Sequence, residues 1–185
     1  MYNYVAVVGL SLYSISLANW FATEREATFD VEPHASNMYV IQGMFNTDQL
    51  RLISETLNAK RQQFVRTNLP VRAAHALSLR DLRNTPVVQL FRDHGTLHRI
   101  QNETGMKLQL MPRSDRNQIN ALSYTEIGDG IDPHTDGNVY FGNRWAGIYV
   151  VRDDGNAKLF VEGHEANLSA NDFLLFKADA LSHYV

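Results

Sequence analysis

Hydrophobic residues in the N-terminal half of the chain recur mostly at helical spacing. Ile53 and Leu57 lie four residues apart and predict one apolar face of an amphipathic helix. A second stretch, from residue 77 to residue 104, also follows a helical pattern, with interruptions expected near Pro86 and Gly95. The first half of the chain is therefore expected to be largely helical.

Short β-rich runs separated by Gly, Asn and Asp begin after Gly105. An earlier alternating run, residues 37–42, predicts a strand, and Asn46 with Gln49 three residues later predicts a capping box at the next helix. Helices followed by many short strands indicate an α+β chain whose C-terminal half is a sandwich or jelly roll, with the helical part packed on its major sheet. The later predicted strands are residues 107–111, 118–124, 145–151, 157–161 and 172–176.

An uncharged apolar run lies near the N-terminus. Residues 5–22 read VAVVGLSLYSISLANWFA, and no charged residue precedes Glu24. The run is about the shortest that can span a bilayer, and it lacks the basic region and cleavage site of a secretory signal. We expect a buried strand or helix of a cytoplasmic protein, and a membrane anchor is the alternative.

Length and composition predict one folded domain over residues 1–185. Hydrophobic residues make up 44% and charged residues 20% of the 185 positions, which are ordinary values for a globular protein. The chain contains no cysteine, so disulfides, thiolate metal ligands and cysteine nucleophiles are excluded. Any protein-bound metal must use histidine, aspartate or glutamate.

Charge is unevenly distributed along the chain. Residues 60–116 contain eleven Lys or Arg and four Asp or Glu, whereas residues 120–185 contain four basic and ten acidic residues. We expect the two segments to pack together and neutralise each other. The alternative is a basic surface for an anionic partner such as nucleic acid.

One His-x-Asp triplet stands out among the seven histidines. His134 and Asp136 form it, after a predicted strand that ends at Tyr124 and a glycine-containing turn. His183 follows a later buried strand, so neighbouring strands can bring the two histidines and the aspartate together. Two histidines and one carboxylate are the facial ligands of non-haem Fe(II) oxygenases, although catalytic zinc sites also use three protein ligands.

Other histidines provide weaker candidates for a metal site. His164 lies in a Glu-Gly-His-Glu turn and is an alternative to His183 as the distal ligand, but a hairpin tip is normally solvated. His94 and His98 stand four apart, and no third ligand is evident near them.

The order and spacing of several motifs resemble the prolyl-4-hydroxylase-like branch of the Fe(II)/2-oxoglutarate dioxygenases. The resemblance is close from about residue 118 to the end of the sequence. The matching text is Tyr124-x-x-x-Gly128-x-Gly130, His134-x-Asp136, Gly147-Ile148-Tyr149-Val150-Val151, Leu159-Phe160-Val161-Glu162-Gly163, Phe173-Leu174-Leu175-Phe176 and His183-x-Val185.

This resemblance implies a double-stranded β-helix and an iron-dependent hydroxylation. O2 and 2-oxoglutarate are consumed, succinate and carbon dioxide are released, and a C–H bond of a peptide, amino acid or other small molecule is hydroxylated. A nucleic-acid demethylase of the same chemistry and a non-catalytic jelly-roll binding module are the alternatives. Oligomeric state is not predicted.

The resemblance also implies where 2-oxoglutarate binds. Tyr124 occupies the position of a tyrosine that contacts it, and Asn120 shares the same strand face in our prediction. Family members usually place a basic residue on the strand after the distal histidine, and this sequence stops at Val185. We therefore expect either that the domain is cut short there or that a basic residue elsewhere, Arg144 or Lys177, takes that role.

Overall fold

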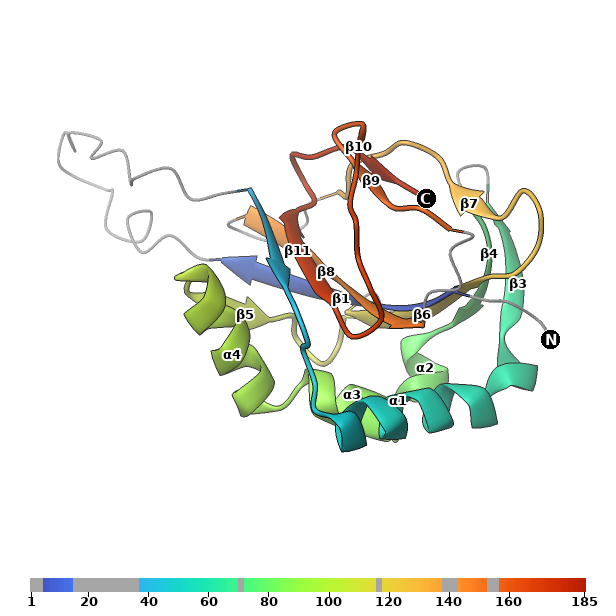
Figure 1. The fold of residues 1–185 in the computed structure, drawn as a ribbon, viewed down its shortest axis with the longest axis horizontal. Helices are drawn as coiled ribbons and strands as arrows, with labels where there is room; N and C mark the ends of the chain where they lie inside the picture. The colour runs from blue at the N-terminus through green and yellow to red at the C-terminus, as the bar shows by residue number, and fades with distance from the viewer. Residues whose placement is uncertain (1–4, 15–36, 70–71, 116–117, 138–142, 153–156) are drawn as a thin grey trace, which may run out of the picture.

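A computed structural model describes residues 5–14, 37–69, 72–115, 118–137, 143–152 and 157–185. Within these residues the chain is α+β, as predicted, with two antiparallel sheets and a layer of helices (Figure 1). The helices are α1 (Thr47–Ala59), the short 3₁₀ helix η2 (Arg61–Gln63), α2 (Leu79–Leu82), α3 (Pro86–Phe91) and α4 (His94–Thr104).

The large sheet contains nine strands among the described residues. Its main path runs in the order β2 (Met38–Ile41), β11 (Phe173–Lys177), β8 (Asn143–Arg152), β1 (Val5–Ser14), β6 (Ile119–Tyr124), β4 (Arg72–Leu77) and β3 (Val65–Leu69). Two short strands lie off this path, β5 (Leu108–Leu110) against β1 and β7 (Gly130–Ile131) against β4. The small sheet has the order β10 (His164–Glu165), β9 (Phe160–Val161), β12 (His183–Tyr184).

Helix α1 begins at the predicted capping box. The Asn46 side chain accepts from the backbone N–H of Gln49, and the Gln49 side chain accepts from the backbone N–H of Asn46, at 2.9 and 3.1 Å. Ile53 and Leu57 are buried on the face that meets the sheet, as their spacing predicts. Local sequence and tertiary packing therefore agree on this helix.

The predicted helical stretch from residue 77 to 104 is divided differently from our expectation. Pro86 occupies the first turn of α3, where its missing N–H costs nothing, so it begins a helix. Gly95 lies inside the first turn of α4, whose N-cap Asp93 accepts from the N–H of Gly95 at 2.7 Å. The interruption between α3 and α4 therefore falls before Asp93 and not at Gly95. The capping side chain of Asp93 fixes the start of α4, and one glycine in the first turn does not interrupt the helix.

Strands also occur in the half of the chain that we expected to be helical. β3 and β4 form an antiparallel hairpin with Val65 opposite Ala76 and Leu69 opposite Arg72. Alanine-rich β4 carries little strand propensity, and its pairing with β6 in the sheet overrides that local preference. The prediction of helices first and strands afterwards is therefore wrong in this region.

The N-terminal run is a central strand over its described part. β1 pairs antiparallel with β6 on one side and with β8 on the other, and its Leu10 and Leu12 are buried. This confirms a strand for residues 5–14, with Leu10 and Leu12 buried, whereas residues 15–22 of the predicted run lie outside the described residues. No helix among the described residues is long and apolar enough to cross a membrane.

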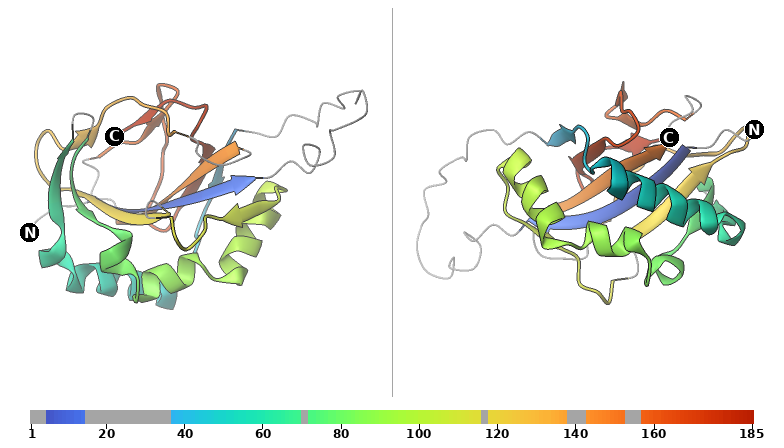
Figure 2. Two further views of the ribbon diagram at one scale, coloured as in Figure 1. Left: turned by 180° about the vertical axis from the view of Figure 1, so that it is seen from behind. Right: turned by 60° about the horizontal axis from the view of Figure 1, so that its bottom comes forward.

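The two faces of the large sheet have different neighbours. One face is covered by the helices (Figure 2). On this face Phe45, Phe91 and Tyr149 meet edge to face, with ring centroids 5.2 to 5.4 Å apart. On the other face, Leu174 and Phe176 of β11 belong to a separate apolar cluster with residues of the small sheet and its loops. The space between the two sheets is where the predicted site residues meet.

Candidate metal centre

His134 and His183 face each other across a pair of backbone hydrogen bonds. The N–H of His134 donates to the carbonyl of His183 at 3.2 Å, and the N–H of His183 donates to the carbonyl of His134 at 2.9 Å. Ile131 and Val185 exchange a second pair at 3.0 and 3.1 Å. Residues 131–134 are therefore hydrogen bonded to residues 183–185. This pairing brings together two histidines that lie far apart in the sequence.

Both imidazole rings are oriented by a nearby carbonyl. Nδ1 of His134 lies 2.8 Å from the carbonyl oxygen of Asp132, and Nδ1 of His183 lies 3.2 Å from that of Leu181. A proton on each Nδ1 satisfies these contacts and leaves the Nε2 lone pair for a ligand. Second hydrogen bonds of this kind commonly fix the tautomer of metal-binding histidines.

Asp136 completes a three-residue group that can hold a metal ion. Its Oδ1 lies 3.8 Å from Nε2 of His134 and 4.0 Å from Nε2 of His183, and the ligand atoms of the three residues lie within 4.8 Å of one another. Ligand atoms ~2.1 Å from one ion and at right angles to each other lie ~3 Å apart. Small side-chain movements of less than an ångström are enough to close the group on an ion.

Arg144 holds the carboxylate of Asp136 from the other side. Its Nη2 lies 3.4 Å from Oδ2 of Asp136, and its Nη1 donates to the carbonyl of Gly137 at 2.5 Å. The backbone N–H of Asp136 donates to the carbonyl of Ala178 at 2.8 Å. These contacts engage Oδ2 and leave Oδ1 directed toward the two histidines.

Burial favours the metal-binding form of the distal histidine. His183 is 8% exposed, and its removal from water, together with the positive charges of neighbouring groups, holds the pKa of this imidazole below its usual value. A neutral imidazole offers the lone pair that a metal requires. The carboxylate of Asp136 then supplies the one negative charge of the group.

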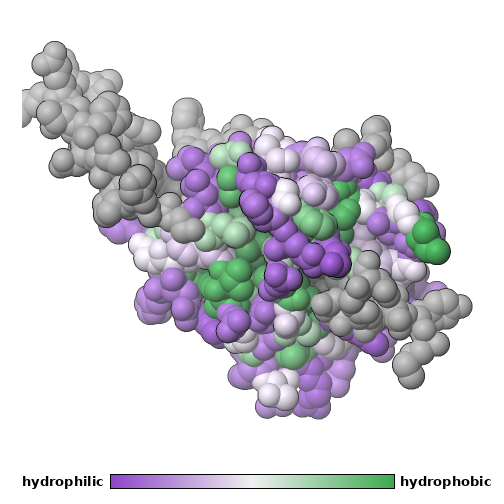
Figure 3. Space-filling model, turned by 45° about the horizontal axis from the view of Figure 1, so that its top comes forward, coloured by the Kyte–Doolittle hydropathy of each residue, from purple (hydrophilic) through white to green (hydrophobic). Residues whose placement is uncertain are grey.

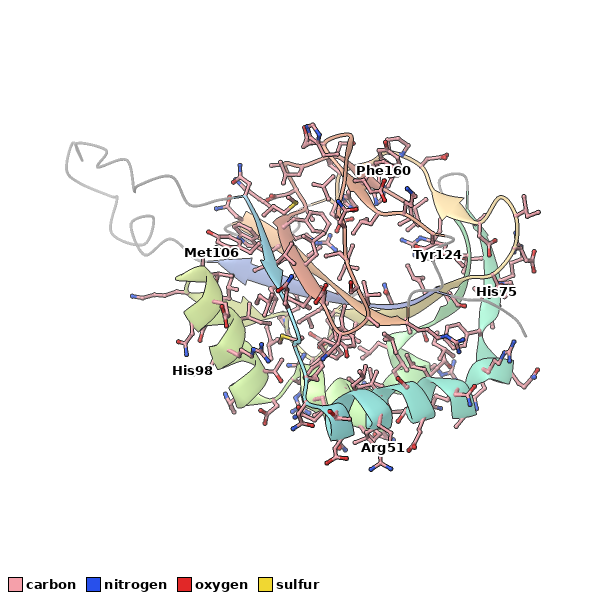
Figure 4. All side chains as sticks on the ribbon, in the orientation of Figure 1. Arg51, His75, His98, Met106, Tyr124 and Phe160 are labelled. Carbon is pink, nitrogen blue, oxygen red and sulfur yellow. The ribbon has the colours of Figure 1, made fainter. Side chains whose placement is uncertain are left out.

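A cavity of about 810 Å³ opens beside this group, between the two sheets. All six predicted site residues line it: Asn120, Tyr124, His134, Asp136, Arg144 and His183. In Figure 4 the Tyr124 side chain lies inside the ring of strands, whereas Arg51 and His98 project outward from their helices. The structure thus brings the predicted residues to one place, and the group can meet a ligand in the cavity.

Tyr124 is buried and stays protonated. Loss of water contact raises the pKa of its hydroxyl well above the ordinary value, although the nearby positive charge of Arg72 acts in the opposite direction. Its aromatic ring packs with Leu122 and Ala74 in a small apolar cluster at the cavity wall. Its O–H is available to donate to an anionic ligand.

Asn120 lies on the same strand face as Tyr124 but farther along β6. The two residues are four apart, which corresponds to about 13 Å along a strand. One small carboxylate cannot contact both side chains at that separation. Asn120 therefore lines the predicted cavity but belongs to a different part of it.

The remaining histidines do not join the group. His164 is exposed on the β9–β10 hairpin, as expected for a solvated turn, and His94 and His98 are exposed on α4. Within the described residues, His134, Asp136 and His183 are the only set of three or more potential ligands that lie close enough to hold one ion. His34 lies outside the described residues.

Two basic residues differ from our expectation in whether they line the cavity. Lys177 is absent from the cavity wall, because alternation along β11 puts it on the same face as Phe173 and Leu175, which pack toward the helices. Arg72, which the sequence analysis did not single out, lines the cavity. Alternate residues of a strand face the same side, which is why Arg72 can line the cavity. This could not be used at the sequence level, because residues 72–77 were not predicted to be a strand.

Comparison of the chain with protein-family models, with curated proteins and with solved structures finds no match. The function must therefore be argued from the residues of the site.

Proposed function

We propose that this protein is a mononuclear non-haem Fe(II) oxygenase that uses 2-oxoglutarate and O2 to hydroxylate a C–H bond. The observation that carries the proposal is the convergence of His134, Asp136 and His183 on the wall of a cavity large enough for small ligands. Three protein ligands on one face of an octahedral ion leave three positions for exogenous ligands.

The donor set favours iron among the metals considered. Two imidazole nitrogens and one carboxylate oxygen match the facial group of Fe(II) oxygenases, and the sequence offers no thiolate for softer metals. Zinc binds similar donors, so a metal titration must include it. When bound, Fe(II) supplies O2 chemistry that couples decarboxylation of 2-oxoglutarate to succinate and CO2 with hydroxylation of the substrate.

The strand order supports a double-stranded β-helix for the catalytic unit. Along the chain, β6, β8 and β11 lie in the large sheet, whereas β9, β10 and β12 form the small sheet. β7 lies at the edge of the large sheet and also hydrogen bonds to Val185 beyond β12. One position in the large sheet, between β8 and β6, is occupied by β1, which pairs antiparallel with both. In an eight-stranded jelly roll, β1 thus takes the position of the strand that would follow β12.

The residues of the chain have separate tasks in this proposal. Nε2 of His134 and of His183 and Oδ1 of Asp136 bind the metal, and Arg144 keeps the second carboxylate oxygen of Asp136 engaged. The apolar side chains of β8 that line the cavity, Ala146, Ile148 and Val150, limit the access of water to the reacting groups. Tyr124 donates its O–H to an anionic ligand.

The cavity favours a small molecule, an amino acid or part of a peptide as substrate. Its volume of about 810 Å³ is in the range of small-molecule sites. The face seen in Figure 3 shows separate hydrophobic patches among hydrophilic residues.

The basic segment gives little support to the nucleic-acid alternative. Arg66 forms ion pairs with Glu126 and Asp129 at 2.7 and 2.9 Å, which joins the basic and acidic segments as expected. Arg92 bonds to Gln118, and Arg99 donates to backbone carbonyls at the end of β2. These arginines serve the fold, so the excess of basic residues does not by itself define a binding surface.

Anaerobic titration with Fe(II), followed by addition of 2-oxoglutarate, tests the proposal. The wild-type protein is expected to bind one iron and then to develop the weak visible charge-transfer absorption of a chelated 2-oxo acid. Admission of O2 should release succinate. His134→Ala, Asp136→Ala and His183→Ala should each abolish the absorption and the succinate.

His164→Ala is the matched control, because this histidine is exposed and outside the metal group. It should leave iron binding unchanged. Wild-type metal affinity in any of the three alanine variants would remove that residue from the site, and tight zinc binding with no response to 2-oxoglutarate would contradict the oxygenase proposal.

A further inference from the structure

The cavity has a basic region in addition to its metal-binding group. Arg72 begins β4 and lines the cavity, on the same strand face as Ala74 and Ala76. Its Nε atom is buried and has no hydrogen-bond partner among the described residues. A guanidinium has five N–H donors, so the part of the Arg72 side chain that lines the cavity can bind an anionic ligand there.

Tyr124 lies close to Arg72 on the neighbouring strand. The register of β4 and β6 places Ala76 opposite Leu122, so its continuation places Ala74 opposite Tyr124. Arg72 is then a diagonal neighbour of Tyr124, at a Cα separation of about 7–8 Å that long side chains bridge. The guanidinium and the phenol O–H are both donors, and a carboxylate accepts from both.

Arg72 also lies within reach of the metal group. It pairs with Ile131 of β7, and His134 is three residues further along the same segment, which puts it no more than about 10 Å from Ile131. The long side chain of Arg72 and the side chains of the metal ligands both extend from the backbone, so their functional groups can lie closer together than the backbone positions do. A short diacid that chelates the metal at one end can therefore reach Arg72 with its second carboxylate.

Other basic residues are less suited to this task. Arg144 already contacts Asp136 and the Gly137 carbonyl, and Lys177 is absent from the cavity wall. β1, which lies between β6 and β8, reads VAVVGLSLYS and contains no basic residue. Arg72 is thus the cavity arginine whose donors are not committed to the metal ligands.

We propose that Arg72, together with the Tyr124 hydroxyl, binds the second carboxylate of the 2-oxo acid and makes the protein selective for 2-oxo diacids over 2-oxo monoacids. This inference rests on the proposed function and adds the residue that sets co-substrate selectivity. It assigns the task to β4, which lies between η2 and α2 along the chain, instead of to Arg144 or Lys177.

Binding of two 2-oxo acids to the anaerobic Fe(II) protein tests the assignment. 2-Oxoglutarate carries the second carboxylate, and 2-oxobutanoate lacks it, while both chelate the metal in the same way. In the wild type, 2-oxoglutarate should bind about 100-fold more tightly, because charged hydrogen bonds to the second carboxylate are strong. Arg72→Gln should remove most of this preference and change 2-oxobutanoate affinity by no more than about threefold.

Variants with smaller changes keep the test valid if Arg72→Gln folds poorly. Arg72→Lys should retain part of the preference, and Tyr124→Phe should lower 2-oxoglutarate affinity about tenfold. Lys177→Gln is the control and should change neither affinity. Equal losses for both acids in the Arg72 variants, or loss of the preference in Arg144→Gln alone, would overturn the assignment.

The two proposals fail differently in this experiment. Binding of both acids with equal affinity by the wild type would overturn the role of Arg72 and leave the metal–2-oxo acid proposal standing. Binding of iron with no response to either acid would overturn both.

Discussion

His134 and His183 exchange two backbone hydrogen bonds, and their ring centroids lie 4.2 Å apart. The main chain therefore sets the separation of the two imidazoles before any ion binds. A preorganised pair loses less conformational freedom on binding than two mobile side chains do. Metal affinity should consequently depend on groups that hold this pairing and on the ligands themselves.

Arg144→Met should weaken metal binding by about 10–100-fold without unfolding the protein, because Arg144 orients Asp136 from outside the ligand set. Anaerobic Fe(II) titration measures the change. Arg51→Met, at an exposed position of α1, is the control. Unchanged iron affinity in Arg144→Met would show that Asp136 does not need this contact.

Gly130→Ala should disturb the metal centre through the backbone. A Cβ at this position would lie 2.6 Å from the carbonyl oxygen of Val185, so the pairing of β7 with the end of the chain must shift. We expect a loss of about 1–3 kcal/mol in the free energy of unfolding, as for other overpacked sites, together with weaker iron binding.

Gly137→Ala provides the comparison for Gly130→Ala, because a Cβ at Gly137 meets no atom within 4 Å. Urea denaturation and iron titration of both variants measure the two effects. Equal stability and equal iron affinity in the two variants would contradict the close approach of Gly130 to Val185.

Asp129→Asn should destabilise the loop that leads to the metal-binding segment. One Asp129 oxygen accepts from the N–H groups of Thr125 and Glu126 at 2.8 and 2.9 Å, and the other accepts from Arg66 at 2.9 Å. The side chain is 1% exposed. Loss of the charge should cost roughly 2 kcal/mol at pH 7.

The contribution of Asp129 should depend on pH. Burial opposes ionisation, but the backbone hydrogen bonds and Arg66 outweigh it and lower the pKa of Asp129 in the folded protein. The unfolded chain then binds more protons near pH 4, so this stability is present above the unfolded pKa of about 3.9 and is lost as the pH falls through the folded pKa. Urea denaturation should show the wild-type advantage over Asp129→Asn shrinking below about pH 4, and a constant difference would contradict this account.

Asn171 joins the segment before α1 to the large sheet. Its side chain accepts from the N–H of Phe45 and from the Tyr149 hydroxyl, both at 2.9 Å, and donates to the Phe45 carbonyl at 2.7 Å. Its φ of 74° lies in the left-handed region, which asparagine and glycine tolerate. We expect the side-chain hydrogen bonds of Asn171 and its tolerance of this backbone conformation each to contribute to the free energy of unfolding.

Two substitutions separate these contributions of Asn171. Asn171→Gly keeps the backbone conformation and should lower stability by about 2 kcal/mol through lost hydrogen bonds, whereas Asn171→Ala should cost about 1 kcal/mol more. Thermal unfolding measures both, with Asn102→Ala on the exposed side of α4 as the control. Equal Tm values for the glycine and alanine variants would show that the backbone conformation is not strained.

Local sequence determined the elements that depend on short-range chemistry. The capping box of Asn46 and Gln49 and the apolar face of α1 could be predicted, because both arise from residues three or four positions apart. The strand around Tyr124 and the one at residues 172–176 could be predicted from alternation and apolar content. The candidate ligands His134, Asp136 and His183 followed from motif order.

Tertiary structure decided which segments become neighbours. Alanine-rich β4 is a strand because its backbone N–H and C=O groups form hydrogen bonds with β3 on one side and with β6 on the other. Arg72 lines the cavity as a consequence of this pairing. The insertion of β1 between β6 and β8 joins residues more than a hundred positions apart. Hydrogen bonds between strands depend on partners that no local pattern encodes, so the sequence by itself could name the candidate ligands and Arg144 but not Arg72, which lines the same cavity.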